Sequence, residues 1–401
     1  MTQEPKSVVE FKNQAYDVET QVPDISREAI ETANKVLGYD YRGAQATVGI
    51  ARDSIKAYCN YMGSTNPLFL DEGYARKTRW GGIIAPPTML GIAMIAPGLR
   101  GVQWIAAGRE WEIYNLLRPG DIVTQRGRYI KAVEKRGGVV PLFLVQTGET
   151  LMVNQRNELV ARAWVSFVRS PRRQAKGGMN YKPRTHKWTE AELAKFEQTI
   201  LSEKPRGATP LYWEDVAEGD PMAPVIYGPL RMTEIALAGA FNDSGSFSGE
   251  GVAHLGAHVY QLLNRRRHPA DSYVDPETGV QDHPHRGHWE RHMAREVGMP
   301  GIYDVGNQRV SWLCRYIYDW MGDDAFLRRL GGILRRPNVV GDVTWVRGRI
   351  VKKWTQDGEH LVRCDLWAEN QLGEVTLQGY AVVRLLSRTV ETSNQGGPQL
   401  L

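Results

Sequence analysis

The chain has 401 residues, of which 42% are hydrophobic and 24% are charged, and its formal net charge is +5. This composition is typical of a globular protein with room for two domain-sized cores, and the lack of any apolar run of about 18 residues excludes a membrane-spanning helix. The first residues, MTQEPKSVVEFKNQ, contain neither an apolar stretch nor a basic leader, so we expect no export and a cytoplasmic location.

In chain order, each half is predicted to contain an acid-capped helix, then an apolar helix, then a run of long strands. The acid-capped helices are expected at Asp53 to Met62 and at Thr233 to Phe241. The apolar helix of the first half, within 87–99, is hydrophobic on nearly all sides. That of the second half lies within 306–320, where apolar residues recur at helical spacing at Val310, Leu313, Cys314 and Ile317.

An internal repeat is the clearest pattern in the chain. The stretch GDIVTQRGR at 120–128 is matched by GDVTWVRGR at 341–349, with a lysine three residues beyond each. Two further blocks match in the same order, 74–76 with 293–295 before this stretch and 154–155 with 370–371 after it. A repeated order of matching blocks predicts one fold that occurs twice.

These elements suggest the domain organisation. We predict an N-terminal domain at 1–170, a linker at 171–208, a C-terminal domain at 209–390 and a tail at 391–401. The linker is basic and rich in Gly and Pro, and Thr189 with Glu192 forms a capping box that begins a short helix. Residues 244–287 are an insertion in the second half, which we interpret as a lid, as a segment that widens the pocket for a bulkier acyl group, or as a dimer contact.

Cysteines and arginines add little to this picture. Cys59, Cys314 and Cys364 lie far apart without a CxxC pair and are predicted to be buried, reduced thiols. Arginines cluster at 265–267, 328–329 and 335–336. Such clusters favour an anionic ligand or nucleic acid, or else they form a solvated basic face.

The chain resembles the MaoC-like hydratases and dehydratases of the double hot-dog type, with a first half similar to the FAS1-like dehydratases. The residues that carry the resemblance are Asn66-Pro67, Asp71, Tyr74-Ala75, the segment GGIIAPP at 81–87 and the two GDxVTxRGR-like strands. The resemblance implies an α+β fold in which two antiparallel sheets each wrap a central helix. It also implies reversible addition of water to a 2-enoyl thioester, with coenzyme A as part of the substrate, no metal or redox cofactor, and self-association.

In the resembled family an aspartate and a histidine act as the acid/base pair, and a glycine at the start of the buried helix donates its N–H to the thioester oxygen. Water must lose a proton as it attacks C3 while C2 gains one, and the charge on the thioester oxygen needs a preorganised donor. The matching positions of the first half hold Ser64, Phe69 and Pro87. Since proline has no N–H, the resemblance implies that this half is catalytically degenerate.

In the second half the resemblance places the histidine at His288 and the glycine at Gly306. We assign the aspartate to Asp243, although the insertion breaks the family pattern and leaves Ser244, Asp282 and Glu290 as alternatives. For coenzyme A we name three basic candidates for substrate binding, which are Arg265, Arg266 and Arg309.

Each assignment has an alternative. His288 belongs to DHPHRGHWERH, and this segment is either a polar loop or, with His292 four residues on, part of a zinc site. Asp243 is also consistent with a helix end whose side chain bonds the backbone, and Gly306 with a residue needed only for a turn.

Three functions therefore remain: an acyl-CoA hydratase/dehydratase, a hot-dog thioesterase, and a non-catalytic subunit that binds acyl-CoA. The first has a named acid/base pair, Asp243 with His288. The second needs a carboxylate that activates water near the thioester carbon. The third is favoured if these two side chains lie apart. No nucleic-acid or membrane partner is expected.

Overall fold

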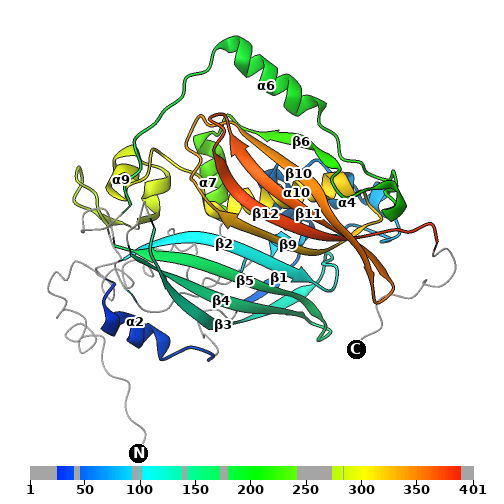
Figure 1. Cartoon of the computed structure of the whole chain (residues 1–401), viewed down its shortest axis with the longest axis horizontal. Coiled ribbons are helices and arrows are strands. Elements are labelled where there is room, and N and C mark those ends of the chain that lie inside the picture. Colours follow the sequence, from blue (N-terminus) through cyan, green and yellow to red (C-terminus); the bar gives the residue numbers. More distant parts are fainter. Residues whose placement is uncertain are drawn as a thin grey trace, which may run out of the picture.

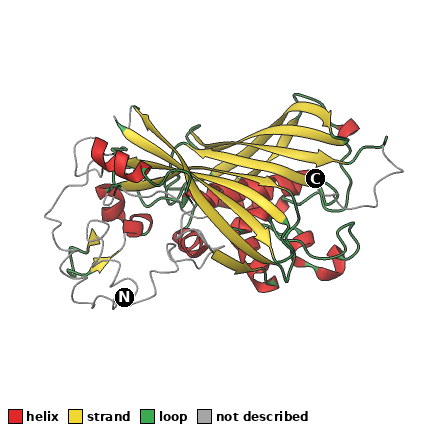
Figure 2. Cartoon of the chain, turned by 90° about the horizontal axis from the view of Figure 1, so that it is seen from below, coloured by secondary structure: helices red, strands yellow, loops and turns green. Residues whose placement is uncertain are grey.

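The computed structural model describes residues 25–39, 46–92, 99, 102–137, 142–171, 179–241, 273–282 and 284–389. Within these residues one large antiparallel sheet runs through the whole molecule, and most of the helices lie on one side of it (Figures 1 and 2). None of the described helices is long and apolar enough to cross a membrane.

The described part of the first half begins with α2 (Arg27–Asn34), β1 (Ala46–Gly49) and α3 (Arg52–Met62), followed by the short helices α4 (Pro67–Leu70) and α5 (Glu72–Ala75). A 3₁₀ turn, η2 (Pro87–Met89), precedes the strands, which are β2 (Gln103–Ile113), β3 (Ile122–Lys135), β4 (Phe143–Asn154) and β5 (Leu159–Ser170). Helix α6 (Glu190–Ser202) then connects the halves, and its capping box between Thr189 and Glu192 is present as expected.

The second half continues with η3 (Trp213–Asp215), β6 (Pro221–Tyr227) and α7 (Met232–Phe241). A small hairpin, β7 (Tyr273–Val274) with β8 (Gln281–Asp282), leads into η6 (Pro284–His288), α9 (Arg291–Glu296) and α10 (Gly306–Met321). The strands are β9 (Phe326–Leu334), β10 (Thr344–Gln356), β11 (Glu359–Asn370) and β12 (Val375–Leu385).

The strand order confirms the duplicated fold. The sheet runs β1-β3-β4-β5-β2-β9-β12-β11-β10-β6, so the two halves are related by symmetry about the central β2–β9 pair. Equivalent register shifts follow Tyr129 in β3 and Ile350 in β10. The sheets of the two halves are therefore joined edge to edge, as in a double hot-dog.

The matched turns use the same hydrogen bonds in both halves. The carboxylate of Asp121 accepts the N–H of Arg118 at 2.8 Å, and that of Asp342 accepts the N–H of Val339 at 2.8 Å. In the adjoining hairpins, the side-chain oxygens of Asn154 and Asn370 each accept two N–H groups of their own turn. The Gly-Asp strand starts are thus turn structure, which explains why they are repeated.

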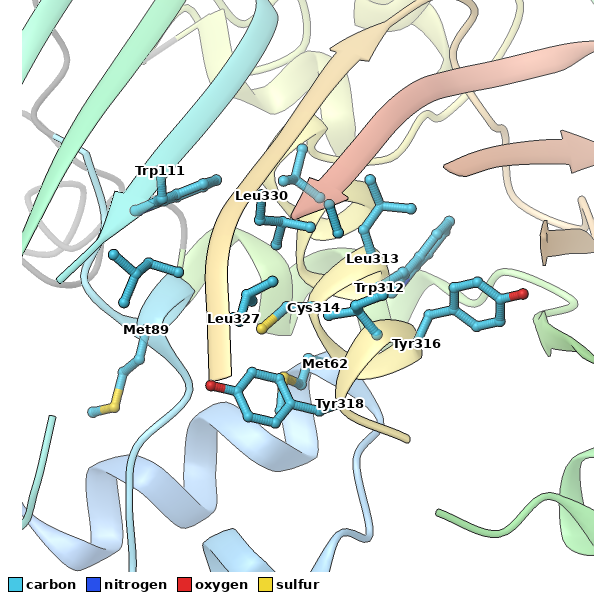
Figure 3. Packing of buried hydrophobic residues seen from close by; sticks show 14 of the residues in the cluster. Met62, Met89, Trp111, Trp312, Leu313, Cys314, Tyr316, Tyr318, Leu327 and Leu330 are labelled. Atoms are coloured by element: carbon cyan, nitrogen blue, oxygen red, sulfur yellow. The ribbon is translucent and has the colours of Figure 1, made fainter. Parts of the chain in front are cut away.

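Helix α10 is the buried helix predicted for the second half. Val310, Leu313, Cys314 and Ile317 are fully buried on it, and Figure 3 shows Leu313 and Cys314 facing the strand residues Leu327 and Leu330. A Cβ added at Gly379 of β12 would lie 2.5 Å from the carbonyl oxygen of Gly331 in β9 and 2.6 Å from Cδ1 of Leu313, so glycine is needed where this strand meets both its neighbour and the helix. All three cysteines are buried thiols, as predicted.

The first half does not repeat this arrangement, and the expected helix within 87–99 is only partly described. Pro87–Met89 form a 3₁₀ turn, and Leu90 to Ile92 are not helical. The helix prediction is therefore wrong for the described residues 87–92. Proline is tolerated in the first turn of a helix, so Pro86 and Pro87 do not explain this, whereas Gly91, which directly follows the 3₁₀ turn and Leu90, disfavours a helix.

The inner face of the first-half sheet is polar where that of the second half is apolar. The strand register pairs five buried polar positions of the first half with five buried apolar positions of the second half. The pairs are Arg109 with Leu330, Gln125 with Val346, Gln146 with Val362, Thr150 with Leu366, and Arg169 with Leu385. Two of these polar residues donate to backbone carbonyls that follow η2, Gln125 to that of Gly91 and Arg169 to that of Leu99. A buried carbonyl outside regular secondary structure needs such a partner.

Candidate active site

The candidate site is organised by residues 303–306, which lead into α10. Tyr303 forms an isolated antiparallel bridge with Val339, and the N–H of Asp304 donates to the carbonyl of Asn338 at 3.0 Å. The segment is thereby fixed to the loop that precedes β10. Helix α10 begins at Gly306, so its first N–H groups lie at the end of this segment.

The ring of His288 packs against the same segment. Its Nδ1 atom lies 2.9 Å from the carbonyl oxygen of Tyr303, and the rings of His288 and Tyr303 have centroids 4.0 Å apart. A carbonyl oxygen only accepts, so Nδ1 carries the proton and Nε2 is the basic nitrogen. Burial lowers the pKa of His288 to about 4, and the imidazole is therefore neutral at physiological pH.

The turn η6 that carries His288 is tied to its surroundings by Arg286. The guanidinium of Arg286 bonds Asp275 at 2.7 Å and Glu290 at 2.6 Å. Asp275 in turn caps the loop of the β7–β8 hairpin through the N–H groups of Glu277 and Thr278. These bonds connect the hairpin, η6 and the start of α9, and they hold the backbone on either side of His288.

Gly306 lies at the seam between the two halves. A Cβ added there would come within 2.4 Å of Leu334 Cδ1 in β9 and 3.0 Å of the Ala106 Cβ in β2. A side chain at this position would require Leu334 to move and would crowd Ala106. The φ of Gly306 is not in the left-handed region, so the requirement is space rather than backbone conformation.

Arg309 was predicted to bind substrate, and the structure contradicts this. The side chain is 6% exposed, its Nε lies 2.7 Å from Asp304, and it donates to the carbonyls of Arg336 and Thr376. A guanidinium bound in this way cannot reach a phosphate outside the protein.

Asp304 was not identified from the sequence. Its carboxylate also accepts the backbone N–H and the side-chain amide of Asn338, at 3.2 and 3.0 Å. Burial raises the pKa of Asp304 to about 6. An aspartate near a helix start with an arginine five residues on was a weak signal for such a pair.

The proposed aspartate, Asp243, lies outside the described residues, as do Ser244, Arg265 and Arg266. Asp282 belongs to strand β8. The carboxylate of Glu290 is bound by Arg286 at 2.6 Å and lies 3.3 Å from His292. Glu290 is therefore engaged by other partners. Among the described residues, no group of three His, Cys, Asp or Glu side chains is placed to hold a metal ion.

The equivalent positions of the first half are part of its core. Phe69 is 1% exposed and packs edge to face on Tyr318 of α10, with ring centroids 5.0 Å apart. Ser64 is buried, and its hydroxyl accepts the N–H of Asn66 at 3.3 Å. Pro87 begins η2 without an N–H to donate. These three side chains form no acid/base site.

Comparison with known families gives one match. Residues 35–163 match the family model described as the FAS1-like dehydratase domain region. This match covers most of the first half and less than half of the whole chain. No match is found among curated proteins.

Solved structures match over nearly the whole length. A MaoC-like dehydratase aligns with a TM-score of 0.59 and 12% identity, covering 88% of this chain and 99% of that one. A MaoC domain dehydratase from Chloroflexus aurantiacus J-10-fl aligns with a TM-score of 0.52 and 14% identity, covering 86% of this chain and 95% of that one. At such identities the likeness concerns the fold alone, and together with the symmetric strand order it confirms the predicted double hot-dog architecture.

Proposed function

We propose that the chain is an acyl-CoA hydratase/dehydratase that adds water to a 2-enoyl-CoA to give a 3-hydroxyacyl-CoA, and reverses this reaction. The observation that carries the proposal is the hydrogen bond between His288 Nδ1 and the Tyr303 carbonyl, three residues before the start of α10. A histidine with one basic nitrogen and a helix N-terminus are thus held by the same short segment. The FAS1-like dehydratase region of the first half and the MaoC-like fold support the same reaction type.

In this mechanism Nε2 of His288, with Asp243, accepts the proton of a bound water as its oxygen attacks C3. The pair then supplies a proton to C2, so no proton is gained or lost overall. The backbone N–H of Gly306, aided by the α10 dipole, stabilises the negative charge on the thioester oxygen. Positioned acid/base groups contribute about 10² to 10⁴ in rate.

The proposed division of labour places this chemistry in the second half. The first half supplies β2, whose Ala106 packs against Gly306, and α3 and α4, which pack against α10 through residues such as Phe69. The reaction requires no metal or redox cofactor in this proposal. Coenzyme A enters with the substrate, and the chain is proposed to self-associate as hot-dog proteins commonly do.

The test is the loss of enoyl-thioester absorbance on a panel of short, long and ring-bearing 2-enoyl-CoAs. We expect native protein to hydrate at least one member, and His288→Gln and Asp243→Asn each to lose about 10² to 10⁴ in rate. His292→Gln is the matched control, since this histidine lies in the same segment with a side chain 50% exposed, and its rate should equal that of the native protein.

Other outcomes separate the alternatives. Release of free coenzyme A thiol without hydration would indicate a thioesterase. A native protein that binds an acyl-CoA but converts none would indicate a non-catalytic subunit. If His288→Gln alone fails, the aspartate has been misassigned and Ser244, Asp282 and Glu290 are to be tested next.

A further inference from the structure

Residues 303–306 carry the carbonyl that contacts His288 and the Gly306 N–H, the two groups on which the proposed site depends. A buried ionic cluster fixes this segment. Asp304 is 1% exposed and is bound by Arg309 and by both donors of Asn338. Arg309 belongs to the first turn of α10, and Asn338 to the loop before β10. We call these three residues the Asp304 clasp.

The clasp lies between the two groups that the reaction needs. The residue before Asp304 provides the carbonyl that receives Nδ1–H of His288, and two residues after it comes Gly306. The segment is short and extended, with Val305 at φ −82° and ψ 127°. A rotation of the backbone at Asp304 therefore moves the Tyr303 carbonyl and the Gly306 N–H together.

A buried charged cluster is a costly means of holding a loop. Its members lose their hydration, and a well-packed apolar group of similar shape is often at least as stable. What an ionic cluster does supply is direction, because a carboxylate with three donors has one favourable orientation. The cluster is therefore better explained by a need for orientation than by a need for stability.

We propose that Asp304 is a positioning residue, held by Arg309 and Asn338, that sets the tautomer of His288 through the Tyr303 carbonyl and aims the Gly306 N–H at the thioester oxygen. This inference rests on the proposed hydration reaction for its catalytic part. Its first part, the control of the His288 tautomer, concerns the protein alone and is measurable without any substrate.

The experiment measures the ¹⁵N imidazole shifts of His288 at pH 7.5 in the full chain, together with kcat and KM on whichever enoyl-CoA the native protein hydrates. The variants are Asp304→Asn, which leaves Arg309 without its carboxylate, and Asn338→Ala, which keeps the charge pair and removes one donor. Asn338→Ala covers the case in which Asp304→Asn does not fold.

Asp319→Asn is the matched control. Asp319 lies on α10, as Arg309 does, is paired with Arg315 at 3.1 Å, and has a pKa that burial also raises to about 6. It lies 15 residues after Asp304, which precedes the helix, and no hydrogen bond or ion pair of the described residues joins it to the 303–306 segment. If the Asp304–Arg309 pair had only a structural role, Asp304→Asn should have the same effects as Asp319→Asn.

In the native protein we expect His288 to carry its proton on Nδ1. In Asp304→Asn and Asn338→Ala the Nε2–H tautomer should appear, and kcat should fall about 10- to 100-fold with little change in KM, as for other groups that orient a reacting residue. Asp319→Asn should lower the melting temperature without altering the tautomer or kcat.

The proposal is overturned if the tautomer in both clasp variants equals that of the native protein, or if Asp319→Asn lowers kcat as much as Asp304→Asn does. A native protein that hydrates no enoyl-CoA would instead refute the proposed function. In that case the tautomer measurement still decides whether the clasp orients His288.

Discussion

Nδ1 of His288 lies 2.9 Å from the carbonyl oxygen of Tyr303, and this contact makes the two ring nitrogens unequal. The nitrogen that contacts the carbonyl carries the proton, and the other nitrogen is the basic one. The ring of His285, with its centroid 4.5 Å from that of His288, restricts the imidazole from another side. The orientation of the base is therefore set by main-chain geometry and ring packing rather than by a carboxylate on Nδ1.

The titration of His288 should be strongly displaced. Burial penalises the imidazolium, so its pKa should lie near 4 rather than at the ordinary 6.5. Between these values the unfolded chain binds more protons than the folded one, and the contribution of His288 to the free energy of unfolding decreases as the pH falls. Residue-specific NMR titration is the measurement, and a midpoint near 6.5 would contradict the burial.

The pH dependence of the melting temperature is a poorer measure of the His288 titration than residue-specific NMR. Burial raises the pKa of Asp304 and of Asp319 to about 6. The folded chain then binds more protons at these two residues than the unfolded chain does, so their contribution decreases as the pH rises toward about 6. The two effects oppose each other in one pH range, which is why each residue must be followed separately.

Tyr303→Phe should leave catalysis intact. The backbone carbonyl of Tyr303 orients His288, while the hydroxyl lies against Gly287, where an added Cβ would be 3.4 Å away. We expect kcat to change by less than about 3-fold, well below the 10² expected of an acid/base group. A loss of the full acid/base contribution would show that the hydroxyl takes part in proton transfer.

Gly306→Ala should displace the start of α10. The new Cβ would meet Leu334 Cδ1 at 2.4 Å and the Ala106 Cβ at 3.0 Å, and a shift of about 1 Å at a reacting group costs on the order of 10² in rate. The double variant Gly306→Ala/Leu334→Ala provides space and should recover part of kcat. If it recovers none while both variants fold, the effect does not come from the collision with Leu334.

Phe69→Ala should destabilise the chain without affecting the chemical step. This ring is buried against Tyr318, and removing such a side chain costs about 3–5 kcal/mol. Denaturant unfolding measures the loss. At a temperature where the variant is folded, kcat should match that of the native protein, and a large decrease would place the first half closer to the reaction than proposed.

The two arginines that bridge the repeated turns should differ in importance. Arg184, from the segment between the halves, binds Asp342 and Glu374 with 21% of its side chain exposed, while Arg156 binds Asp121 and Glu158 with 50% exposed. Both aspartates are buried, so the two cases differ in the arginine, and a solvent-exposed arginine contributes less than one that is largely shielded from water. Arg184→Ala should therefore lower the free energy of unfolding by clearly more than Arg156→Ala, and equal losses in chemical denaturation would refute this.

Local patterns predicted the elements well. The helices α3 and α7 begin within one residue of their expected positions, and α10 covers the whole of the expected 306–320. The repeated turns predicted the duplication because the aspartates and asparagines in them accept N–H groups only two to four residues away, and such bonds have a fixed sequence. Such features depend on neighbours in the chain, which a sequence contains.

What failed depends on distant partners. The apolar character of 87–92 does not distinguish a buried helix from a buried irregular segment, and the distinguishing signal lies on another strand, in Gln125, which binds the carbonyl of Gly91. The sequence does not distinguish Arg309 from Arg265 as candidates for binding an anion. Only the fold shows that Arg309 is buried against Asp304. His288 and Gly306 were named by resemblance, and their catalytic roles stay predictions.

The symmetric strand order about β2 and β9 means that two equivalent sheets are encoded by different parts of one chain, so their sequences can change independently. In a dimer of identical chains, every substitution appears twice, and an arginine placed inside one sheet would be placed inside the other as well. Joining both copies in one chain removes that coupling. One half can then hold Arg169 at the position where the other half holds Leu385. A substitution that one half could not accommodate can therefore occur in the other half alone.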